Sequence, residues 1–405
     1  MAIIVNVQTE RAVPQVNDEG LALVILRNAV PKSPTVEGDI VKIDAYDVSA
    51  LDAILTTPAT GDNLLAEAQE IYALEYLINR GVSVLVYFVE NRTAFTLADD
   101  IPNIVDVTEL GYKFIVSPFS YVAADDDEAV LTAFVANTTV REAVAYDSVR
   151  DIQLFLDLTP LAAATDIPLI TLVDASPKIE LFINSGFTSE GSRFTSIIDF
   201  GADNESLFTG IPASLAALVR KVKLMKEAKP WIPVAGERNG KIAEFTSLER
   251  DLTTVEKELF QAGYVNVLIS RVGIGPLFVS QNTQYGVADD TLMRSHAVTT
   301  ALAVKRYLIT SGLSTEFLPN NQKTWDNLQL QLEAYLSDMK QSEGITTYVV
   351  SIGKGITMTA EEIEAGTLKI AVSFNPISVV EKVTFNVTIS ETNNIYNVNV
   401  TGGVL

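Results

Sequence analysis

The segments that come nearest to a catalytic or ligand-binding motif each lack a residue that the chemistry requires. The sequence at 186–193, GFTSEGSR, places Gly186 and Gly191 at the spacing of a phosphate-binding loop, but Ser192 stands where the loop needs a lysine. Without that cation the phosphate charge is uncompensated, so the segment does not predict a nucleotide site. The glycine pair at 273–275 is too short for a dinucleotide fingerprint, and the chain has no G-x-S-x-G motif for a nucleophilic serine.

The chain contains one histidine, His296, and no cysteine. This composition excludes multi-histidine metal sites, disulfides, thiolate chemistry and cysteine-based zinc or iron–sulfur centres. A catalytic histidine needs partners within reach, and a lone histidine on a helix is more often a hydrogen-bonded or exposed residue. We therefore expect no catalytic residue, no cofactor and no metal ion. The alternative is a cytosolic α/β enzyme with a carboxylate site, which would need a pocket of convergent acids with perturbed pKa values.

The sequence from Asp125 to Glu128 is a run of four acids. It lacks the alternating spacing by which calcium loops point oxygens at one ion. An acidic first turn of a helix, favoured by the helix dipole, explains the run better.

The formal net charge of −22 argues against nucleic acid as a direct partner and against binding at a membrane surface, since such binders are basic. No apolar run approaches the ~18 residues of a membrane span, so we expect no membrane insertion. No signal peptide is predicted, because the N-terminus lacks a basic start followed by an apolar core. The charge makes self-association salt-sensitive unless basic patches on one copy meet acidic ones on the next.

One expected helix, at 211–229, concentrates positive charge. Its basic residues are Arg220, Lys221, Lys223, Lys226 and Lys229. We expect these lysines mostly on the solvated side of the helix, opposite a face formed by Leu215, Leu218, Val219, Val222 and Met225. The alternative is contact with an acidic surface, which in a polymer of acidic copies is the neighbouring copy. The same two alternatives, a solvated face or contact with an acidic surface, apply to Lys305 and Arg306 on a helix expected at 291–311.

From about residue 21 to 270 the sequence alternates between apolar strand segments and amphipathic helices. The expected strands are 21–30, 82–89, 112–120, 167–176, 193–201 and 264–270, and the expected helices are 62–81, 211–229 and 248–263. The strand segments are apolar and β-branched without alternation, as buried strands of a parallel sheet are. This order predicts a doubly wound α/β domain.

Beyond about residue 275 two long helices, at 291–311 and 322–341, precede several strands, which predicts a compact α+β domain. Residues 381–405 then alternate apolar and polar residues, the mark of half-buried strands. The apolar positions are Val383, Phe385, Val387 and Ile389, followed after the turn-like sequence ETNN by Tyr396, Val398 and Val400. These strands either form a self-contained hairpin or pair with another copy.

Residues 1–20 read as an arm that carries a short apolar strand with Ile3, Val5 and Val7. The chain therefore has strand-like segments at both ends. Because an unpaired strand edge is a liability in a soluble monomer, such segments pair with each other or join other copies. Strand donation to a neighbour's sheet gives affinity through main-chain hydrogen bonds. This favours a polymeric assembly protein over an enzyme.

Four segments, in order and spacing, resemble the contractile phage tail sheath proteins. The first runs from Trp231 through Gly236 to Asn239-Gly240, and the second is the strand, glycine turn and strand at 264–286. The third contains Lys305-Arg306, the Phe-x-Pro-Asn turn at 317–320 and the helix opening on Trp325. The fourth comprises the closing strands around Asn375-Pro376. The resemblance covers residues 205–391 well, and the first 200 residues by layout.

The resemblance implies four parts: an N-terminal arm at 1–20, an outer and middle α/β domain at 21–275, an inner α+β sheath domain at 276–390, and a C-terminal arm at 391–405. It implies a subtilisin-like layout for the middle domain without catalytic residues. Arms from neighbouring copies would complete a sheet on the inner domain. Val383–Ile389 would then belong to the subunit's own sheet, while Tyr396–Val400 and the N-terminal strand would be exported.

The resemblance also implies a function. Sheath subunits form stacked rings around a tail tube and contract to drive it through the host envelope for genome ejection. The implied partners are other copies, the tube protein, and the baseplate and tail terminator proteins. The protein would belong to the virion and assemble in the host bacterial cytoplasm. Lys305 and Arg306, with Lys221, Lys223 and Lys226, are the candidates for tube or neighbour contact. The close variant is the sheath of a tailocin or of an extracellular contractile injection system.

Overall fold

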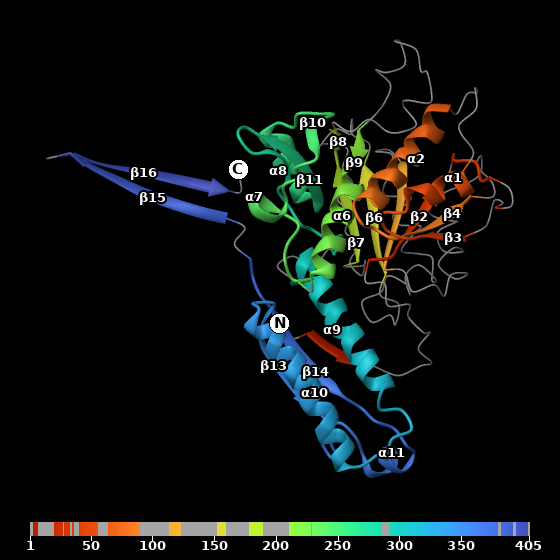
Figure 1. The fold of residues 1–405 in the computed structure, drawn as a ribbon. Helices are drawn as coiled ribbons and strands as arrows, with labels where there is room; N and C mark the ends of the chain where they lie inside the picture. Colours follow the sequence, from red (N-terminus) through yellow and green to blue (C-terminus); the bar gives the residue numbers. More distant parts are fainter. Residues whose placement is uncertain are drawn as a thin grey trace.

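The computed structural model describes residues 3–6, 20–26, 28–32, 35, 40–55, 64–89, 113–122, 152–158, 178–188, 210–227, 229–285, 291–379, 382–391 and 394–403. They form an α/β domain built on a large sheet, a smaller layer of helices and strands, and a hairpin that projects from both (Figure 1). Helix α9 (Ser295–Leu313) runs from the large domain into the smaller layer.

The large sheet has eight strands in the order β12-β11-β7-β6-β5-β2-β4-β3. The strands are β2 (Ala22–Leu26), β3 (Ile40–Ile43), β4 (Val84–Phe88), β5 (Phe114–Val122), β6 (Gln153–Leu158), β7 (Ile179–Ile183), β11 (Val265–Arg271) and β12 (Gly275–Phe278). The strands from β4 to β11 run parallel, while β3 and β12 are antiparallel at the two edges. The prediction of a parallel sheet interleaved with helices is confirmed at this level.

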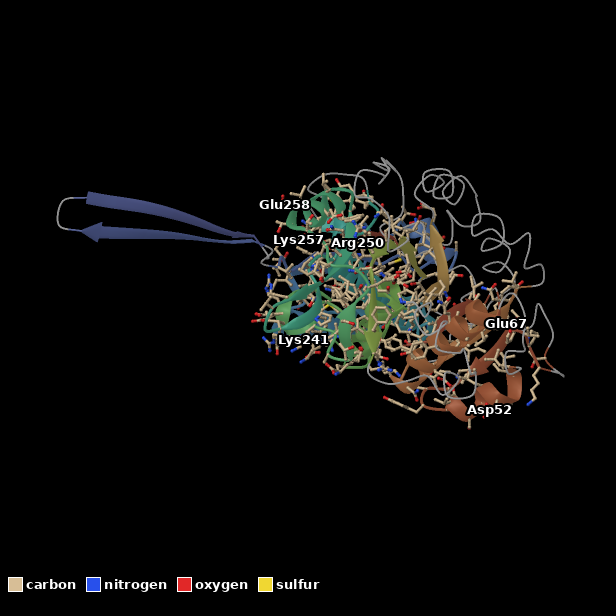
Figure 2. The ribbon with its side chains drawn as sticks, turned by 90° about the horizontal axis from the view of Figure 1, so that it is seen from above. Asp52, Glu67, Lys241, Arg250, Lys257 and Glu258 are labelled. Carbon is tan, nitrogen blue, oxygen red and sulfur yellow. The ribbon has the colours of Figure 1, made fainter. Side chains whose placement is uncertain are left out.

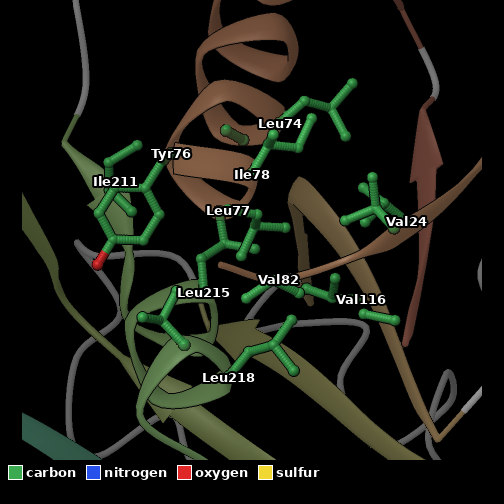
Figure 3. Packing of buried hydrophobic residues seen from close by; sticks show 14 of the residues in the cluster. Val24, Leu74, Tyr76, Leu77, Ile78, Val82, Val116, Ile211, Leu215 and Leu218 are labelled. Atoms are coloured by element: carbon green, nitrogen blue, oxygen red, sulfur yellow. The ribbon is translucent and has the colours of Figure 1, made fainter. Parts of the chain in front are cut away.

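Both faces of the sheet are covered. Helices α2 (Leu64–Asn79) and α6 (Ala213–Lys226) pack on one face, and α8 (Thr254–Ala262) packs on the other through Phe260. Alternate residues of β2 enter the hydrophobic cores on the two faces of the sheet. Because β2 is buried on both faces, it is apolar along its whole length. Figure 3 shows Leu77 of α2 gathered with Leu215 and Leu218 of α6.

A helix or strand is found in each of the predicted segments 62–81, 211–229, 248–263, 21–30, 82–89, 112–120 and 264–270, but the helix predicted at 248–263 begins only at Thr254, after its cap Thr253, and the strand predicted at 21–30 ends at Leu26. The predicted strands at 167–176 and 193–201 lie outside the described residues. Strands β6 and β7 were not predicted, although both are buried along their length; β6 includes Gln153 and Asp157, and β7 includes Glu180. Short elements complete this domain: η1 (Val48–Ala50), α1 (Leu51–Ile54) and α7 (Gly236–Asn239).

Asn184 turns the chain out of the large sheet after β7. It is a buried non-glycine residue at a φ of 87°, and its carbonyl accepts from the Ala213 amide at the start of α6. Its side-chain amide donates to the carbonyls of Arg250 (2.8 Å) and Leu268 (3.0 Å), and its oxygen accepts from the Ser185 amide (2.9 Å). The chain then enters a second sheet of β8 (Ser185–Thr188), β9 (Ile211–Pro212) and β10 (Phe245–Leu248).

We expect Asn184→Ala to lower the free energy of unfolding by roughly 3 kcal/mol, because it removes the side-chain hydrogen bonds to the Arg250 and Leu268 carbonyls and places a Cβ-bearing residue without a polar side chain at positive φ. Asn184→Gly also lacks the side-chain hydrogen bonds but has no backbone strain at positive φ, so it should be only about 1 kcal/mol more stable than Asn184→Ala. Urea unfolding followed by circular dichroism measures both. Equal stability of the alanine and wild-type chains would contradict the assigned role of the side chain.

Asp157 is a buried carboxylate at the end of β6. It accepts from the Ser214 amide in the first turn of α6 (3.0 Å) and from the Ser214 hydroxyl. Burial raises the pKa of Asp157 to about 7, and the two hydrogen bonds from Ser214 oppose this rise. The Asp157 carboxyl therefore binds its proton more tightly in the folded state than in the unfolded chain. As the pH rises from about 4 to about 7, ionisation of Asp157 lowers the free energy of unfolding.

Asp157→Asn should make the chain more stable at pH 8 by roughly 2 kcal/mol and flatten the loss of stability between pH 4 and 7. The asparagine keeps an acceptor for the Ser214 amide and offers an N–H to the hydroxyl oxygen. Ser214→Ala is the control: it removes one donor to the carboxylate and should steepen the same loss. Unfolding curves at several pH values test this, and parallel pH profiles for the wild-type and Asp157→Asn chains would refute it.

The smaller layer, here called the C-terminal layer, comprises α9, α10 (Gln322–Gln341), β13 (Ile345–Ser351), β14 (Ala371–Pro376) and β1 (Ile3–Asn6). Its core includes one face of α10, the helix predicted at 322–341, with Trp325, Leu328, Leu332, Leu336 and Met339 buried. Trp231 joins that core from the large domain. Two short helices, the 3-10 helix η3 (Thr291–Met293) and α11 (Ala360–Glu364), complete the layer.

Candidate assembly interface

The last two strands, β15 (Lys382–Glu391) and β16 (Asn394–Gly403), form an antiparallel hairpin. The hairpin extends alone from the body in both views (Figures 1 and 2). The register sets Ile389 opposite Tyr396 and Val387 opposite Val398, so apolar positions of one strand are paired with apolar positions of the other. The self-contained hairpin turning after Glu391 is therefore the arrangement found in the single chain.

The expectation that Val383–Ile389 belongs to the subunit's own sheet is wrong for the described structure, because β15 pairs only with β16. The long β-ladder of the hairpin explains the difference, since every residue from Lys382 to Glu391 has a register partner. Residues 383–390 and 394–403 contain no charged residue, in a chain whose net charge is −22. A lone two-stranded ribbon is marginal in water, so this hairpin is suited to a partner surface.

The sheet of the C-terminal layer offers an edge for strand addition. Its order is β1-β14-β13, and within the described ranges β13 has a neighbour on one side only. Val349 of β13 is exposed, whereas Val350 enters the core. The outward positions of the sheet, including Thr347, Ser373 and Asn375, carry no charge. Such a surface imposes little desolvation cost on an apolar partner strand.

The N-terminal strand of the same chain occupies the other edge. Ile3 of β1 lies opposite Phe374, and Val5 lies opposite Val372 in an antiparallel ladder with β14. Val7 lies outside the described residues. The predicted exported strand is thus paired within its own chain in this structure, and its export remains a prediction.

The basic run of α6 is only partly on the surface. Lys223 and Lys226 are exposed, although the Lys226 ammonium also donates to the Gly81 carbonyl (2.6 Å). Lys221 is buried, so the expectation that it lies on the solvated side and contacts a partner is wrong for this residue. The sequence held the signal: Lys221 is three residues after Leu218 and four before Met225, which puts it on the apolar face.

Lys305 is also buried on α9, and Arg306 is half-buried. Neither residue presents a freely exposed charge, which weakens the expectation that this helix contacts the tube through them.

Lys221 belongs to a polar cluster between the large domain and α9. Its ammonium pairs with the carboxylate of Glu180 on β7, and the hydroxyl of Ser295 donates to the same carboxylate (2.8 Å). Burial lowers the pKa of Lys221, while the negative charge of Glu180 opposes this shift. The cluster fixes the first turn of α9 against the central sheet, so the two parts of the molecule are joined by a specific buried contact.

His296 extends this junction to the root of the hairpin. Its Nε2 donates to the Ile377 carbonyl (3.0 Å), and its Nδ1 lies 3.0 Å from the side-chain amide of Gln281. Burial lowers the pKa of His296, and the cations Arg294 and Lys221 lower it further against the effect of the Ile377 hydrogen bond. The one histidine is thus a buried residue that is hydrogen-bonded through Nε2, one of the two alternatives that the sequence interpretation gave.

Within the described ranges, no group of three or more acidic or histidine side chains is placed to hold a metal ion. Nor does any helix in this part of the chain have the length and apolar character needed to cross a membrane.

Solved structures of sheath proteins match nearly the whole chain. A chain of the anti-feeding prophage (AFP) baseplate matches with a TM-score of 0.68 and 19% identity over 95% of this chain and 97% of its own. The contracted sheath of PVC, an extracellular contractile injection system, gives 0.62 and 15% over 96% of both chains. A sheath tail protein of Desulfitobacterium hafniense gives 0.54 and 9% over 98% and 99%. No family model and no curated protein sequence matches.

The chain has the fold of sheath proteins from contractile systems. More particularly, it is the fold shared by tail sheath proteins and by the sheaths of AFP and PVC. The resemblance noted in the four sequence segments is confirmed at the level of the fold.

Proposed function

We propose that this protein is the sheath subunit of a contractile tail, which polymerises around a tube and contracts to drive that tube through an envelope. The observation that carries the proposal is the fold match to sheath proteins across almost the full length of both chains. The hairpin that projects from the body supports it, since its residues 383–390 and 394–403 carry no charge and a lone two-stranded ribbon is suited to pairing outside its own chain.

In this proposal the hairpin of one copy adds to the free edge of β13 in the next. Main-chain hydrogen bonds along β13 would supply affinity, and the alternation of Tyr396, Val398 and Val400 would fix the register. The N-terminal strand with Ile3 and Val5 would exchange its pairing on β14 in the same manner. Backbone pairing keeps copies linked while their domains move as rigid bodies, which a contracting polymer requires.

The finer parts of the proposal follow from the resemblance. We include in the proposal the domain limits at 20, 275 and 390 and the doubly wound, subtilisin-like layout of the large domain. We also include a non-enzymatic role, together with the tube, baseplate and terminator proteins as partners, assembly in a bacterial cytoplasm, and the absence of direct nucleic-acid contact. Lys223 and Lys226 remain the exposed basic residues proposed to meet an acidic neighbour.

The first candidate is a phage tail sheath that serves genome ejection in a virion. The matches to AFP and PVC favour a second candidate, the sheath of an extracellular contractile injection system or tailocin. The genes beside this one distinguish the two, because capsid and terminase genes accompany only the phage.

Negative-stain microscopy of the purified protein, alone and with its tube protein, tests the proposal. Rings or helical tubes are expected. A protein that stays monomeric over a wide range of salt and protein concentration, and also with the tube protein, would overturn it. Because the chain is strongly acidic, the assembled fraction should depend on salt.

A further inference from the structure

An apolar side chain is displayed at the turn between α9 and α10. Phe317 is fully exposed and Leu318 is 53% exposed. Phe317 also has a φ of 63°, a left-handed conformation that is rare for a bulky residue. A strained backbone that holds a large apolar ring in water is a cost to the monomer, and such costs concentrate at functional contacts.

The turn that carries Phe317 is held firmly. The Leu318 amide donates to the Thr315 carbonyl (3.2 Å), which closes the turn around Phe317. Asn320 donates to the carbonyls of Ile363 (3.2 Å) and Thr367 (3.1 Å) and accepts from the indole of the buried Trp325 (2.7 Å). The ring is therefore presented by a rigid support, which reduces the entropy lost when a partner binds it.

The same layer contains an open hollow of about 450 Å³ lined by residues 354–360. The hollow is formed by a compact loop in which the Gly355 amide donates to the Met358 carbonyl (2.8 Å) and the Gly353 amide to the Thr357 hydroxyl (3.1 Å). Ile356, at its rim, is 71% exposed, and Met358 lines it from the core side. The hollow is open to solvent, its lining mixes Ile356 and Met358 with Lys354, Thr357 and Thr359, and it is large enough to admit an aromatic ring.

Phe317 does not fill this hollow in its own chain, since its side chain is fully exposed. Each feature carries an exposed charge: Glu316 precedes Phe317, and Lys354 lines the hollow and also interacts with Glu361 of its own chain, in the first turn of α11. A head-to-tail contact between this ring and this hollow propagates into rings or helical polymers, whereas a reciprocal contact, in which each copy's ring enters the other's hollow, closes on a pair.

We propose that Phe317 of one copy inserts into the hollow at residues 354–360 of a second copy, with Glu316 of the first facing Lys354 of the second. The contact rests on the proposed function, because it is one of the contacts between neighbouring subunits of the polymer. It is distinct from the strand pairing of the hairpin, since it uses the α9–α10 turn and the loop after β13.

The absence of cysteine in the chain allows a direct test. Full-length Leu318→Cys and Ile356→Cys proteins, in which the Phe317 ring is retained beside the cysteine, are mixed in equal amounts, assembled, and treated with a short bis-maleimide. We expect a cross-linked pair at a yield at least tenfold above that of each protein treated alone. The matched control pairs Ile356→Cys with Val272→Cys, which is fully exposed on the β11–β12 turn and should not cross-link.

The outcomes separate the inference from the proposed function. If microscopy shows tubes but the Leu318→Cys and Ile356→Cys mixture cross-links no better than the Val272→Cys control, the inference alone is overturned. Efficient cross-linking of Leu318→Cys with itself would also overturn it, because the α9–α10 turns of two copies would then meet each other. If no tubes form in the wild-type protein, the proposed function fails and this contact fails with it.

Charge reversal gives an independent measurement. Glu316→Lys and Lys354→Glu are each expected to raise the protein concentration needed for assembly by about fivefold, the effect of an exposed ion pair replaced by repulsion. The double variant restores the opposite charges in exchanged positions and should return that concentration to near the wild-type value. A double variant that assembles worse than both single variants would contradict the pairing.

Discussion

A chain that ends at residue 379, without the hairpin, is expected to fold as the wild-type does but to require at least about 100-fold higher concentration to assemble. The stability of the body should persist, because β15 and β16 form a sheet with no other strand among the described residues. Ile377 is retained, so its carbonyl still accepts from His296. A 100-fold change corresponds to the loss of about 2.7 kcal/mol of association free energy, a modest share for one added strand pairing.

Circular dichroism and thermal unfolding measure the fold of the truncated chain, and sedimentation with microscopy measures assembly. Val398→Asp and Asn397→Asp form a matched pair in the full-length chain, since they place the same charge on neighbouring positions of β16. The alternation predicts that the change at Val398 impairs assembly much more. Unchanged assembly of the truncated chain would show that the hairpin is not a joint. Loss of folding would show that it belongs to the subunit's own core.

The elements that the sequence predicted well are those with a strong period. Helices α2, α6 and α10 have apolar faces at helical spacing, and their cores form where that spacing puts them. Strands β6 and β7 were missed because short, mostly apolar runs lack a period that separates strand from helix. The chain enters the sheet of β8, β9 and β10 through Asn184, which has a positive φ and whose side-chain hydrogen bonds link segments distant in sequence. No local pattern encodes such a link.

Only part of the candidate assembly interface could be predicted, because its partner contacts are also not encoded in a local pattern. Alternation identified the residues of β15 and β16 but not their partner, because a strand edge is complementary to many others. Lys221 shows the opposite error: a cluster of basic residues suggested a surface, whereas its helical position pointed inward. Glu180, which lies 41 positions away in sequence, supplies the charge that makes this burial tolerable. The ring of Phe317 was noted only as part of a motif, because exposure and backbone strain are visible only in three dimensions.

Lys221→Met should lower the free energy of unfolding by about 3–5 kcal/mol, the largest stability effect of a single substitution expected in this chain. The change leaves the buried carboxylate of Glu180 with the Ser295 hydroxyl as its remaining hydrogen-bond donor among the contacts described above. An uncompensated charge in a low-dielectric interior is far costlier than the ion pair that it replaces. Urea unfolding at neutral pH measures the loss.

The double variant Lys221→Met/Glu180→Gln removes both charges and keeps an amide oxygen for Ser295, so it should unfold within about 1 kcal/mol of the wild-type. Lys223→Met, two residues along the same helix but exposed, is the matched control and should change stability by less than about 0.5 kcal/mol. If the double variant is as unstable as Lys221→Met, packing rather than charge compensation explains the loss. If Lys221→Met instead leaves stability intact and abolishes assembly, Lys221 acts at an interface as the sequence first suggested, and the buried junction described here is wrong.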